Sequence, residues 1–364
     1  MVRVTATGTL AAPPERSRRG ARVTLAIVEP AARAASFAHE VRAGLSAVPK
    51  RIPCRFFYDA EGSRLFEAIC ELPEYYVTRA EREILAAHAD EIAASVPAET
   101  TLVELGSGSA TKTRLLIEAL LRRQETLRYV PVDISRSALE ASALELVAAY
   151  PRLTVNAVAA EYQDGLRYLY TLAALRAGGA GAATAAAPGT DMPKLVLWLG
   201  SNVGNLGRDE AAAFLRRVRE AMGPRDHLLI GIDRRKDRAV LEPAYDDAQG
   251  VTARFNKNLL ARINRELGGH FDLDAFDHRA TYGEAEGRIV MELVSRRAQA
   301  VPIDALGIEV PFAAGEAIHT EDSYKYADKE IGALAAAAGF AVERQWYDAH
   351  RRFTDALLRP LPTV

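Results

Sequence analysis

The chain has 364 residues, 49% of them hydrophobic, and its 46 basic and 48 acidic side chains leave a net charge of −2. This near-neutral balance gives no reason to expect nucleic acid or an anionic membrane as a partner, and no apolar run approaches the roughly 20 residues of a membrane span. The length suits one large domain or two modest ones, and the oligomeric state is left open, with a monomer compatible.

The first 35 residues lack the uninterrupted apolar core of a signal peptide, and we interpret 1–35 as a poorly ordered tail. Cys54 and Cys70 form neither a metal-like pair nor a disulfide framework. This suits the reducing cytoplasm, where we expect the protein to reside. The seven histidines show no ligand spacing, so no metal is expected.

An aromatic-rich segment at 55–79, with turn signals at 61–63 and 72–74, precedes a helix predicted over 80–94. Apolar strands then alternate with amphipathic helices. The predicted strands are 101–105, 128–133, 153–162, 194–200 and 227–233, and the predicted helices are 112–123, 135–150 with Ser135 as N-cap, a segment near 166–175, and 208–222. This alternation predicts parallel βαβ units with helices on both faces of one sheet.

Two stretches interrupt this alternation. Residues 177–193 are rich in alanine, glycine and threonine, and are predicted to form a flexible surface insertion. Between about 237 and 330, a helical stretch at 255–267 and a strand-like piece at 288–295 indicate a second subdomain. The last two segments, FAVERQWYDAH and RRFTDALLRP, are predicted strands that could complete the sheet as an antiparallel pair.

The stretch 101–113, TLVELGSGSATKT, combines a strand, a glycine turn and a helix N-terminus. Such a turn points free backbone N–H groups at one spot, where a charged or polar group of a ligand can sit. A dinucleotide site requires G-x-G-x-x-G and a P-loop requires G-x-x-x-x-G-K-[ST], but in both patterns Thr111 stands where a glycine belongs. NAD and nucleoside triphosphates are therefore the weaker candidates.

S-adenosylmethionine fits the neighbouring residues better. Glu104 precedes the turn, Asp133 ends the second strand, where it can accept both ribose hydroxyls, and Glu161-Tyr162 at the third strand end can bind the adenine amine and cover its ring. Ligands lie at the carboxyl edge of such sheets. For Asp133 alone, a charge at a helix N-terminus is an equally good interpretation. Together these strand ends favour a Rossmann-like class I methyltransferase sheet.

Several segments together resemble the histidine Nα-methyltransferases of ergothioneine biosynthesis. They are FFYDAEGSRLFEAICELPEYYVTRAEREIL, LVELGSGSATKT, LWLGSNVGNL, AYDDAQGVTARFNKNLL and IHTEDSYKY, and the resemblance covers about residues 37–360. It implies that S-adenosylmethionine is used to trimethylate the α-amino nitrogen of L-histidine, through mono- and dimethyl intermediates, to hercynine.

We expect an α/β fold with two domains. The methyltransferase domain comprises 80–236 and 326–364, and a smaller α+β substrate-binding domain comprises 36–79 and 237–325. The active site is expected in the cleft between them. The resemblance implies cofactor contacts at five positions: Gly106, Lys112, Asp133, Glu161 and Tyr162. The last two depart from the Asp-Phe pair common in the family, although a carboxylate and an aromatic ring are kept.

The resemblance also implies where the substrate amino acid binds. Tyr75 and Asn205 match residues that hold its amine, and Tyr245 and Asn205 match those near its carboxylate. Gly200 lines the site near the methyl group. Without the resemblance, core packing is the simpler role for Tyr75. Tyr58 is a further aromatic that could face the growing ammonium, or a core tyrosine.

Glu321 and Ser323 match the pair that holds the imidazole ring, and Met291 matches an apolar wall of that pocket. A glutamate can accept a ring N–H, and a hydroxyl can serve either ring nitrogen. A pocket built for those bonds discriminates strongly against rings that lack them. From local sequence alone, 320–323 is simply a polar turn.

Methyl transfer to a neutral amine requires no metal and no covalent nucleophile, since alignment and desolvation lower the barrier. Tyr75, whose phenol has a reference pKa of about 10, is expected to orient the amine rather than to act as a strong base. One alternative is an N-methyltransferase acting on another amino acid or an aromatic amine. Another is a non-catalytic cofactor-binding or partner-binding domain, for which the polar residues of a second pocket would have no use.

Overall fold

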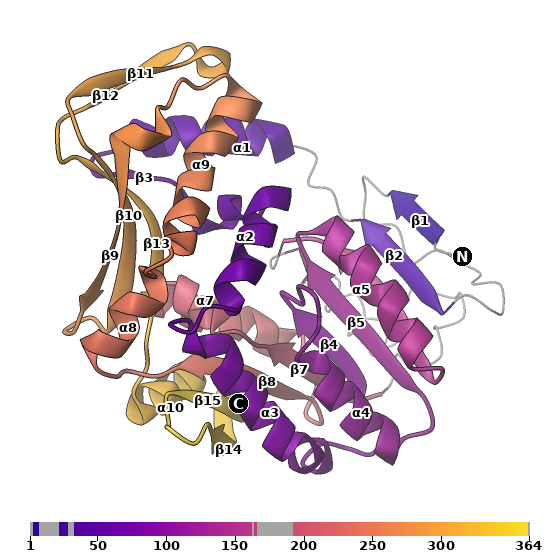
Figure 1. The fold of residues 1–364 in the computed structure, drawn as a ribbon. Helices are drawn as coiled ribbons and strands as arrows, with labels where there is room; N and C mark the ends of the chain where they lie inside the picture. The colour runs from indigo at the N-terminus through magenta and orange to yellow at the C-terminus, as the bar shows by residue number, and fades with distance from the viewer. Residues whose placement is uncertain (1–2, 7–21, 28–32, 162–163, 166–191, 363–364) are drawn as a thin grey trace.

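A nine-stranded sheet forms the centre of the computed structural model, which describes residues 3–6, 22–27, 33–161, 164–165 and 192–362 (Figure 1). Its strand order is β1-β2-β6-β5-β4-β7-β8-β15-β14. The bounds are β1 Arg3–Ala6, β2 Val23–Ile27, β4 Thr101–Leu105, β5 Leu127–Asp133, β6 Leu153–Ala159, β7 Lys194–Trp198, β8 His227–Asp233, β14 Phe340–Tyr347 and β15 Phe353–Pro360. The strands from β1 to β8 are parallel, whereas β15 pairs antiparallel with β8 and β14. The predicted antiparallel pair at the chain end is confirmed.

Helices cover both faces of this sheet, and successive strand residues face them in turn. On β4, Leu102 belongs to a core that includes residues of α3, α4 and α5, whereas Val103 belongs to a core that includes residues of α7 and α10. These helices are α3 Tyr76–Ala94, α4 Thr113–Arg123, α5 Arg136–Ala149, α7 Arg208–Glu220 and α10 Asp328–Ala337. Because both faces are covered, β4, β7 and β8 are buried along their whole length. The predicted α/β, Rossmann-like class is confirmed.

A smaller second part contains a four-stranded sheet with the order β3-β13-β10-β9 (Figure 1). Its strands are β3 Lys50–Arg51, β9 Phe276–Gly283, β10 Arg288–Ser295 and β13 Ala317–Tyr324, and a separate hairpin joins β11 Gln299–Ile303 to β12 Ile308–Phe312. The helices of this part are α1 Arg33–Leu45, α2 Ala60–Cys70, α8 Arg238–Tyr245 and α9 Val251–Leu267. Helix α9 packs against both α2 and the sheet. The second part thus draws on 36–79 and 237–325, the stretches from which we expect the substrate-binding domain.

Several sequence predictions are wrong in detail. Strands β1 and β2 lie within 1–35, where a poorly ordered tail was expected, and Val23, Leu25 and Ile27 of β2 are buried beside β6. The turn expected at 61–63 is instead the first turn of α2, capped by the Asp59 carboxylate, which accepts from the Gly62 N–H at 2.7 Å. Helix α3 begins four residues earlier than predicted.

Three predictions concern residues outside the described part of the chain. They are the helix near 166–175, most of the insertion at 177–193, and the adenine-site tyrosine at position 162.

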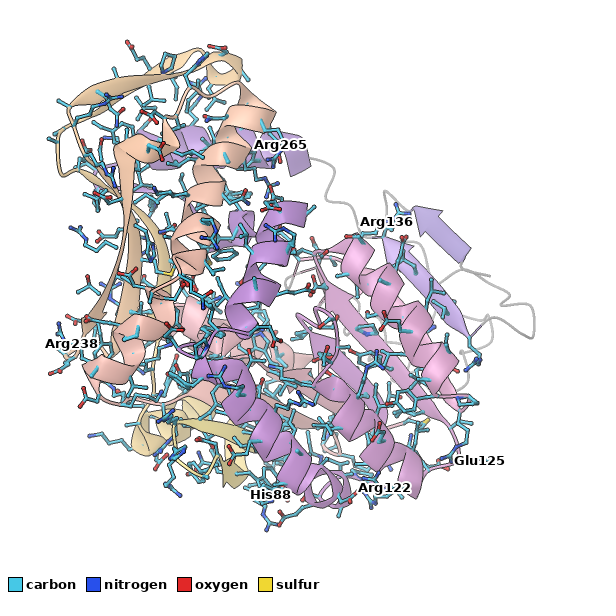
Figure 2. All side chains as sticks on the ribbon, viewed as in Figure 1. His88, Arg122, Glu125, Arg136, Arg238 and Arg265 are labelled. Atoms are coloured by element: carbon cyan, nitrogen blue, oxygen red, sulfur yellow. The ribbon has the colours of Figure 1, made fainter. Side chains whose placement is uncertain are left out.

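Charged side chains stand on the outer surfaces of the covering helices. Arg122 on α4, Glu125 just beyond it and Arg136 on α5 are exposed and lie at the periphery of the view in Figure 2. Within the described ranges, no helix has both the length and the apolar character needed to cross a membrane.

The sheet has one point where its strand order reverses. From β4 the chain continues to β5 and β6 on one side, and then returns to add β7 and β8 on the other. In open α/β sheets, ligands bind at this point, beside the carboxyl ends of the strands. Here that point is the end of β4, where the glycine turn begins.

Candidate active site

The glycine turn has the backbone conformation that its sequence requires. Gly106 has φ of 74° and Gly108 of 50°, both in the left-handed region where glycine is favoured. The Gly106 N–H donates to the Val132 carbonyl at 2.8 Å, which fixes the turn to β5. A Cβ placed on Gly108 would meet no atom within 4 Å, so one side of the turn is open.

Asp133, at the end of β5, ties this turn to the next helix. Its Oδ2 accepts from the Gly108 N–H at 2.8 Å, and its Oδ1 accepts from the Ser135 N–H at 2.8 Å. Burial raises the pKa of Asp133, although these backbone N–H groups oppose the rise. Ser135 caps α5 as predicted. Each carboxylate oxygen retains acceptor capacity, so Asp133 can serve the helix N-terminus and a ligand's hydroxyls together.

Glu104 lies beneath the turn and serves the protein itself. Its carboxylate accepts from the Thr113 hydroxyl at 2.8 and 2.9 Å and from the Tyr129 hydroxyl. Burial raises the pKa of Glu104 to about 7, against the lowering effect of these two hydrogen bonds. The side chain therefore joins β4 to α4 and β5, and it is only 3% exposed.

Lys112 is linked to the far side of the site through Glu81 of α3. The Lys112 ammonium pairs with Glu81 Oε2, and Glu81 Oε1 accepts from the Gly200 N–H at 2.7 Å. Burial would lower the pKa of Lys112, but the Glu81 carboxylate outweighs it and raises that pKa. Glu81 has no exposed surface, and a Cβ on Gly231 would come within 2.0 Å of its Oε1. Position 231 therefore has to be glycine for Glu81 to occupy this place.

The remaining expected cofactor residues are only partly described. Glu161 follows β6 at the same edge of the sheet, and its Oε1 lies 4.0 Å from Nε of Arg55. Its side chain is 40% exposed, so the carboxylate remains accessible. The following tyrosine lies outside the described residues.

All seven expected substrate residues lie around one pocket. Its empty volume is about 510 Å³, including the part open to solvent, and the lining comes from both parts of the molecule. The lining residues are Tyr58, Phe66, Ile69, Tyr75, Gly200, Ser201, Asn202, Asn205, Ala244, Tyr245, Thr252, Phe255, Met291, Glu321 and Ser323. Sequence reasoning omitted Phe66, Phe255 and Ser201, which carry no local signal of a site.

A β-bulge aims two of the polar side chains into this pocket. In the ladder, Met291 pairs with Glu321, and Leu293 pairs with Ile318. Strict alternation from Ile318 would place Thr320 inward and Glu321 outward. The register shift leaves Thr320 as the extra residue, and its hydroxyl donates to the Met291 carbonyl at 3.0 Å. Residues 320–323 are thus part of a bulged strand, and the polar turn expected from local sequence is wrong.

Aromatic rings form another wall of the pocket. The rings of Tyr75 and Tyr245 meet edge to face with centroids 6.2 Å apart, and Phe66 meets Tyr75 in the same way. Burial raises the pKa of Tyr75 well above 10, so its phenol stays protonated at neutral pH. Tyr58 is half-buried, packs against the core and lines the pocket.

The Glu321 side chain lines the pocket. None of the described residues donates a hydrogen bond to its carboxyl group. Burial raises the pKa of Glu321 to about 7, while the positive charge of Lys325 opposes the rise. Near neutral pH this side chain can therefore change protonation state, and its oxygens are open to a ligand.

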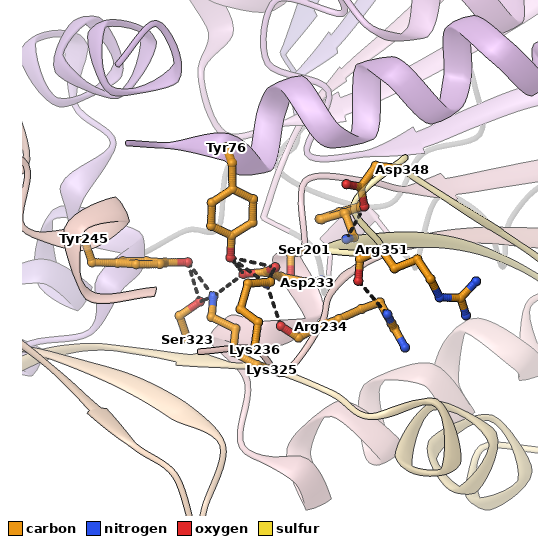
Figure 3. Close-up of polar contacts among 11 residues, drawn as sticks. Tyr76, Ser201, Asp233, Arg234, Lys236, Tyr245, Ser323, Lys325, Asp348 and Arg351 are labelled. Atoms are coloured by element: carbon orange, nitrogen blue, oxygen red, sulfur yellow. Dashed lines mark hydrogen bonds and ion pairs between the residues drawn. The ribbon is translucent and has the colours of Figure 1, made fainter. Parts of the chain in front are cut away.

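A charged network lies directly behind Tyr245 and Ser323 (Figure 3). Lys325, with no exposed surface, pairs with Asp233 at 2.8 Å and donates to the Tyr245 hydroxyl at 2.7 Å and to the Ser323 hydroxyl at 2.9 Å. Sequence reasoning missed Lys325, which directly follows the end of β13.

The comparisons with known proteins identify a family. The family model "Histidine-specific methyltransferase, SAM-dependent" matches residues 37–360. The chain belongs to this family. A histidine N-alpha-methyltransferase from Mycolicibacterium smegmatis is 42% identical over 85% of this chain and 90% of its own length. Another from Mycobacterium tuberculosis is 43% identical with the same coverage. Ergothioneine biosynthesis protein 1 of Neurospora crassa is 32% identical over 82% of this chain, which corresponds to 32% of that longer protein.

The sheet edge of this histidine-specific methyltransferase fits S-adenosylmethionine, on which the family depends. The open side of Gly108 admits a ligand against the backbone, and Asp133 retains lone pairs for hydroxyl groups. The Lys112 ammonium lies 3.8 Å from a Cβ position on Gly200, so a cation stands between the turn and the pocket. These residues match a molecule with hydroxyl groups at one end and a carboxylate at the other.

Proposed function

We propose that this methyltransferase converts L-histidine to hercynine by adding three methyl groups to its α-amino nitrogen, within ergothioneine biosynthesis. The observation that carries the proposal is the pocket in which Tyr75, Asn205, Tyr245, Glu321 and Ser323 converge next to Gly200. Polar groups for an amine, a carboxylate and a ring thus line one cavity. The names of the bacterial relatives at 42% and 43% identity support the same activity.

Within this proposal, each polar residue has a distinct part of histidine to bind. Tyr75 and Asn205 hold the amine, and Tyr245 and Asn205 lie near the carboxylate. Glu321 and Ser323 hold the imidazole, with Met291 as an apolar wall. Gly200 lines the site where the amine meets the methyl group.

We further propose that the cofactor lies along the sheet edge. Gly106 and Asp133 hold its adenosine, Lys112 pairs with its carboxylate, and Glu161 with Tyr162 binds the adenine. Bound S-adenosylmethionine supplies the electrophilic methyl group. No metal has a part in this proposal.

The chain's own residues lower the barrier by holding the amine in place. A protonated Tyr75 cannot act as a phenolate base, so it orients the neutral amine through its hydroxyl. The aromatic rings that line the pocket exclude water, which strengthens the electrostatic interactions within it. Mono- and dimethylhistidine remain substrates because the ring and carboxylate contacts do not change as the amine is methylated. Cys54 and Cys70 are free thiols, which fits a cytoplasmic location.

The test is an incubation of the protein with a mixture of amino acids and S-adenosylmethionine carrying a deuterated methyl group. Mass spectrometry then identifies which amino acid gains label and how many methyl groups it gains. Trimethylated histidine is expected, with no label in phenylalanine or tryptophan. Consumption of another amino acid while histidine stays unlabelled would overturn the proposed substrate.

A further inference from the structure

The buried ammonium of Lys325 uses all of its hydrogen-bond donors on fixed partners. A lysine has three N–H donors and no acceptor. Here the three nearest acceptors are Asp233 Oδ2 at 2.8 Å, the Tyr245 hydroxyl at 2.7 Å and the Ser323 hydroxyl at 2.9 Å (Figure 3). Burial would lower the pKa of Lys325, but the Asp233 carboxylate outweighs it, so the group stays charged. Both hydroxyl oxygens must therefore accept from it.

The hydroxyls of Tyr245 and Ser323 also bond to each other, at 2.9 Å. One of their two hydrogens lies in this bond, and the other is left to point elsewhere. Because a phenol is the stronger donor and an aliphatic hydroxyl the better acceptor, we assign the shared hydrogen to Tyr245, which leaves the Asn205 amide as the donor to the substrate carboxylate. Ser323 then accepts twice, from Lys325 and Tyr245, and both of its lone pairs are used. Its own hydrogen is the one that remains for the pocket.

We propose that Lys325 is a positioning residue that fixes Ser323 as a hydrogen-bond donor and so makes the pocket specific for a neutral imidazole ring. The inference rests on the proposed function. One ring nitrogen carries the hydrogen that Glu321 accepts, and the other offers its lone pair to Ser323. A ring without an acceptor nitrogen leaves the Ser323 hydrogen unpaired, and an imidazolium brings an N–H against it.

The network supplies a matched control. Asp233 pairs with two lysines, Lys325 and Lys236, and Lys236 donates to Tyr76 rather than to a hydroxyl of the pocket. Either lysine can be replaced by methionine while the other still neutralises Asp233. Lys325→Met and Lys236→Met therefore remove the same kind of charge from the same carboxylate, but only the first releases Ser323.

The test compares histidine with 3-(pyrrol-2-yl)alanine and 3-(pyrrol-3-yl)alanine, each of which keeps one ring N–H and has C–H in place of the other nitrogen. For the wild type, kcat/KM for histidine should exceed that of the better analogue by about 10- to 100-fold, the cost of one unpaired buried donor. In Lys325→Met the ratio should fall below about threefold, because Ser323 can turn its hydrogen away. In Lys236→Met it should stay near the wild-type value.

Two outcomes overturn the inference alone: histidine turnover with an unchanged ratio in Lys325→Met, or an equal fall in Lys236→Met. A wild-type protein that neither binds nor methylates histidine overturns the proposed function and this inference with it.

A second measurement needs no variant and covers the case in which Lys325→Met does not fold. Ring-¹⁵N-labelled histidine is bound to the wild-type protein at a pH of about 5.5, roughly one unit below the side chain's reference pKa of about 6.5. The inference requires two unlike nitrogen resonances, one protonated and one not, where free histidine is mostly imidazolium. If the bound ligand instead shows two similar resonances, both from protonated nitrogens, the inference is overturned.

Discussion

Glu104 beneath the glycine turn and Glu321 in the pocket differ in what surrounds them, although burial raises the pKa of each to about 7. The Glu104 carboxylate accepts from the hydroxyls of Thr113 and Tyr129, so the protein itself satisfies it. The Glu321 carboxyl receives no hydrogen bond from any described residue and lines a cavity. A shifted pKa therefore does not distinguish a structural carboxylate from one that is set to bind a ligand. Unused acceptor capacity that faces a cavity does.

The largest expected effect is on stability, at Glu104. Glu104→Ala leaves the buried hydroxyls of Thr113 and Tyr129 without their acceptor, which costs about 3 kcal/mol of the free energy of unfolding. Thermal unfolding of the ligand-free protein should show a drop of several degrees in Tm. Glu104→Gln, which keeps an acceptor oxygen, should lose less. An unchanged Tm in the alanine variant would remove the structural role given to Glu104.

Glu321→Ala should instead impair binding. Loss of a charged acceptor for the ring is expected to raise the Kd for histidine by about 10- to 100-fold, with the Kd for S-adenosylmethionine changed less than about twofold. Isothermal titration of each ligand measures both. Asp322→Ala is the matched control, because that neighbouring carboxylate pairs with Arg288 and does not line the pocket. Equal losses for both ligands in Glu321→Ala would contradict the pocket assignment.

Asp133→Ala should show the reverse preference. Loss of its hydrogen bonds to the ribose hydroxyls is expected to raise the Kd for S-adenosylmethionine about tenfold and to leave the Kd for histidine nearly unchanged. The same titrations report it. Ser135 retains its own capping bond to the Ala138 N–H, so helix α5 should persist. Unchanged cofactor affinity would leave Asp133 with only its role at the helix N-terminus.

Glu321 also makes the stability of the protein depend on pH. Because the folded state raises the pKa of Glu321 from 4.5 to about 7, its ionisation costs stability as pH rises between those values. Glu321→Gln should therefore raise Tm relative to wild type at pH 8 and leave it nearly unchanged at pH 4. Melting curves at both pH values check this. An increase in Tm of the same size at both would mean that relieved packing, and not ionisation, is responsible.

The central sheet could be predicted from sequence because its strands are buried on both faces and read as short apolar runs. The strands at 101–105 and 227–233, and the strand at 288–295 of the second sheet, have the predicted bounds. Strand β2 escaped prediction although its sequence, VTLAI, alternates, because five residues are a short pattern and their partner β6 lies more than a hundred residues later. Pairing of that kind is invisible to periodicity.

The pocket shows a different limit. The part of β13 that lines the pocket carries polar side chains, and a run of polar residues resembles a turn in the sequence. The bulge at Thr320 also breaks the alternation by which a strand is recognised. The family resemblance identified Glu321 and Ser323, but not the lysine that holds Ser323 in place. Lys325 acts only through its contacts, and contacts across the fold, such as that with Asp233, cannot be read from spacing.

One carboxylate, that of Glu81, contacts both the Lys112 ammonium, at the start of the helix after the glycine turn, and the backbone N–H of Gly200, which lines the pocket. A ligand that draws the Lys112 ammonium toward itself weakens the Lys112–Glu81 ion pair. The hydrogen bond from the Gly200 N–H to Glu81 then changes in strength as well. The affinities of the two ligands are then thermodynamically coupled. Coupling is reciprocal, so bound histidine should change the Kd for S-adenosylmethionine by the same factor by which bound S-adenosylmethionine changes the Kd for histidine.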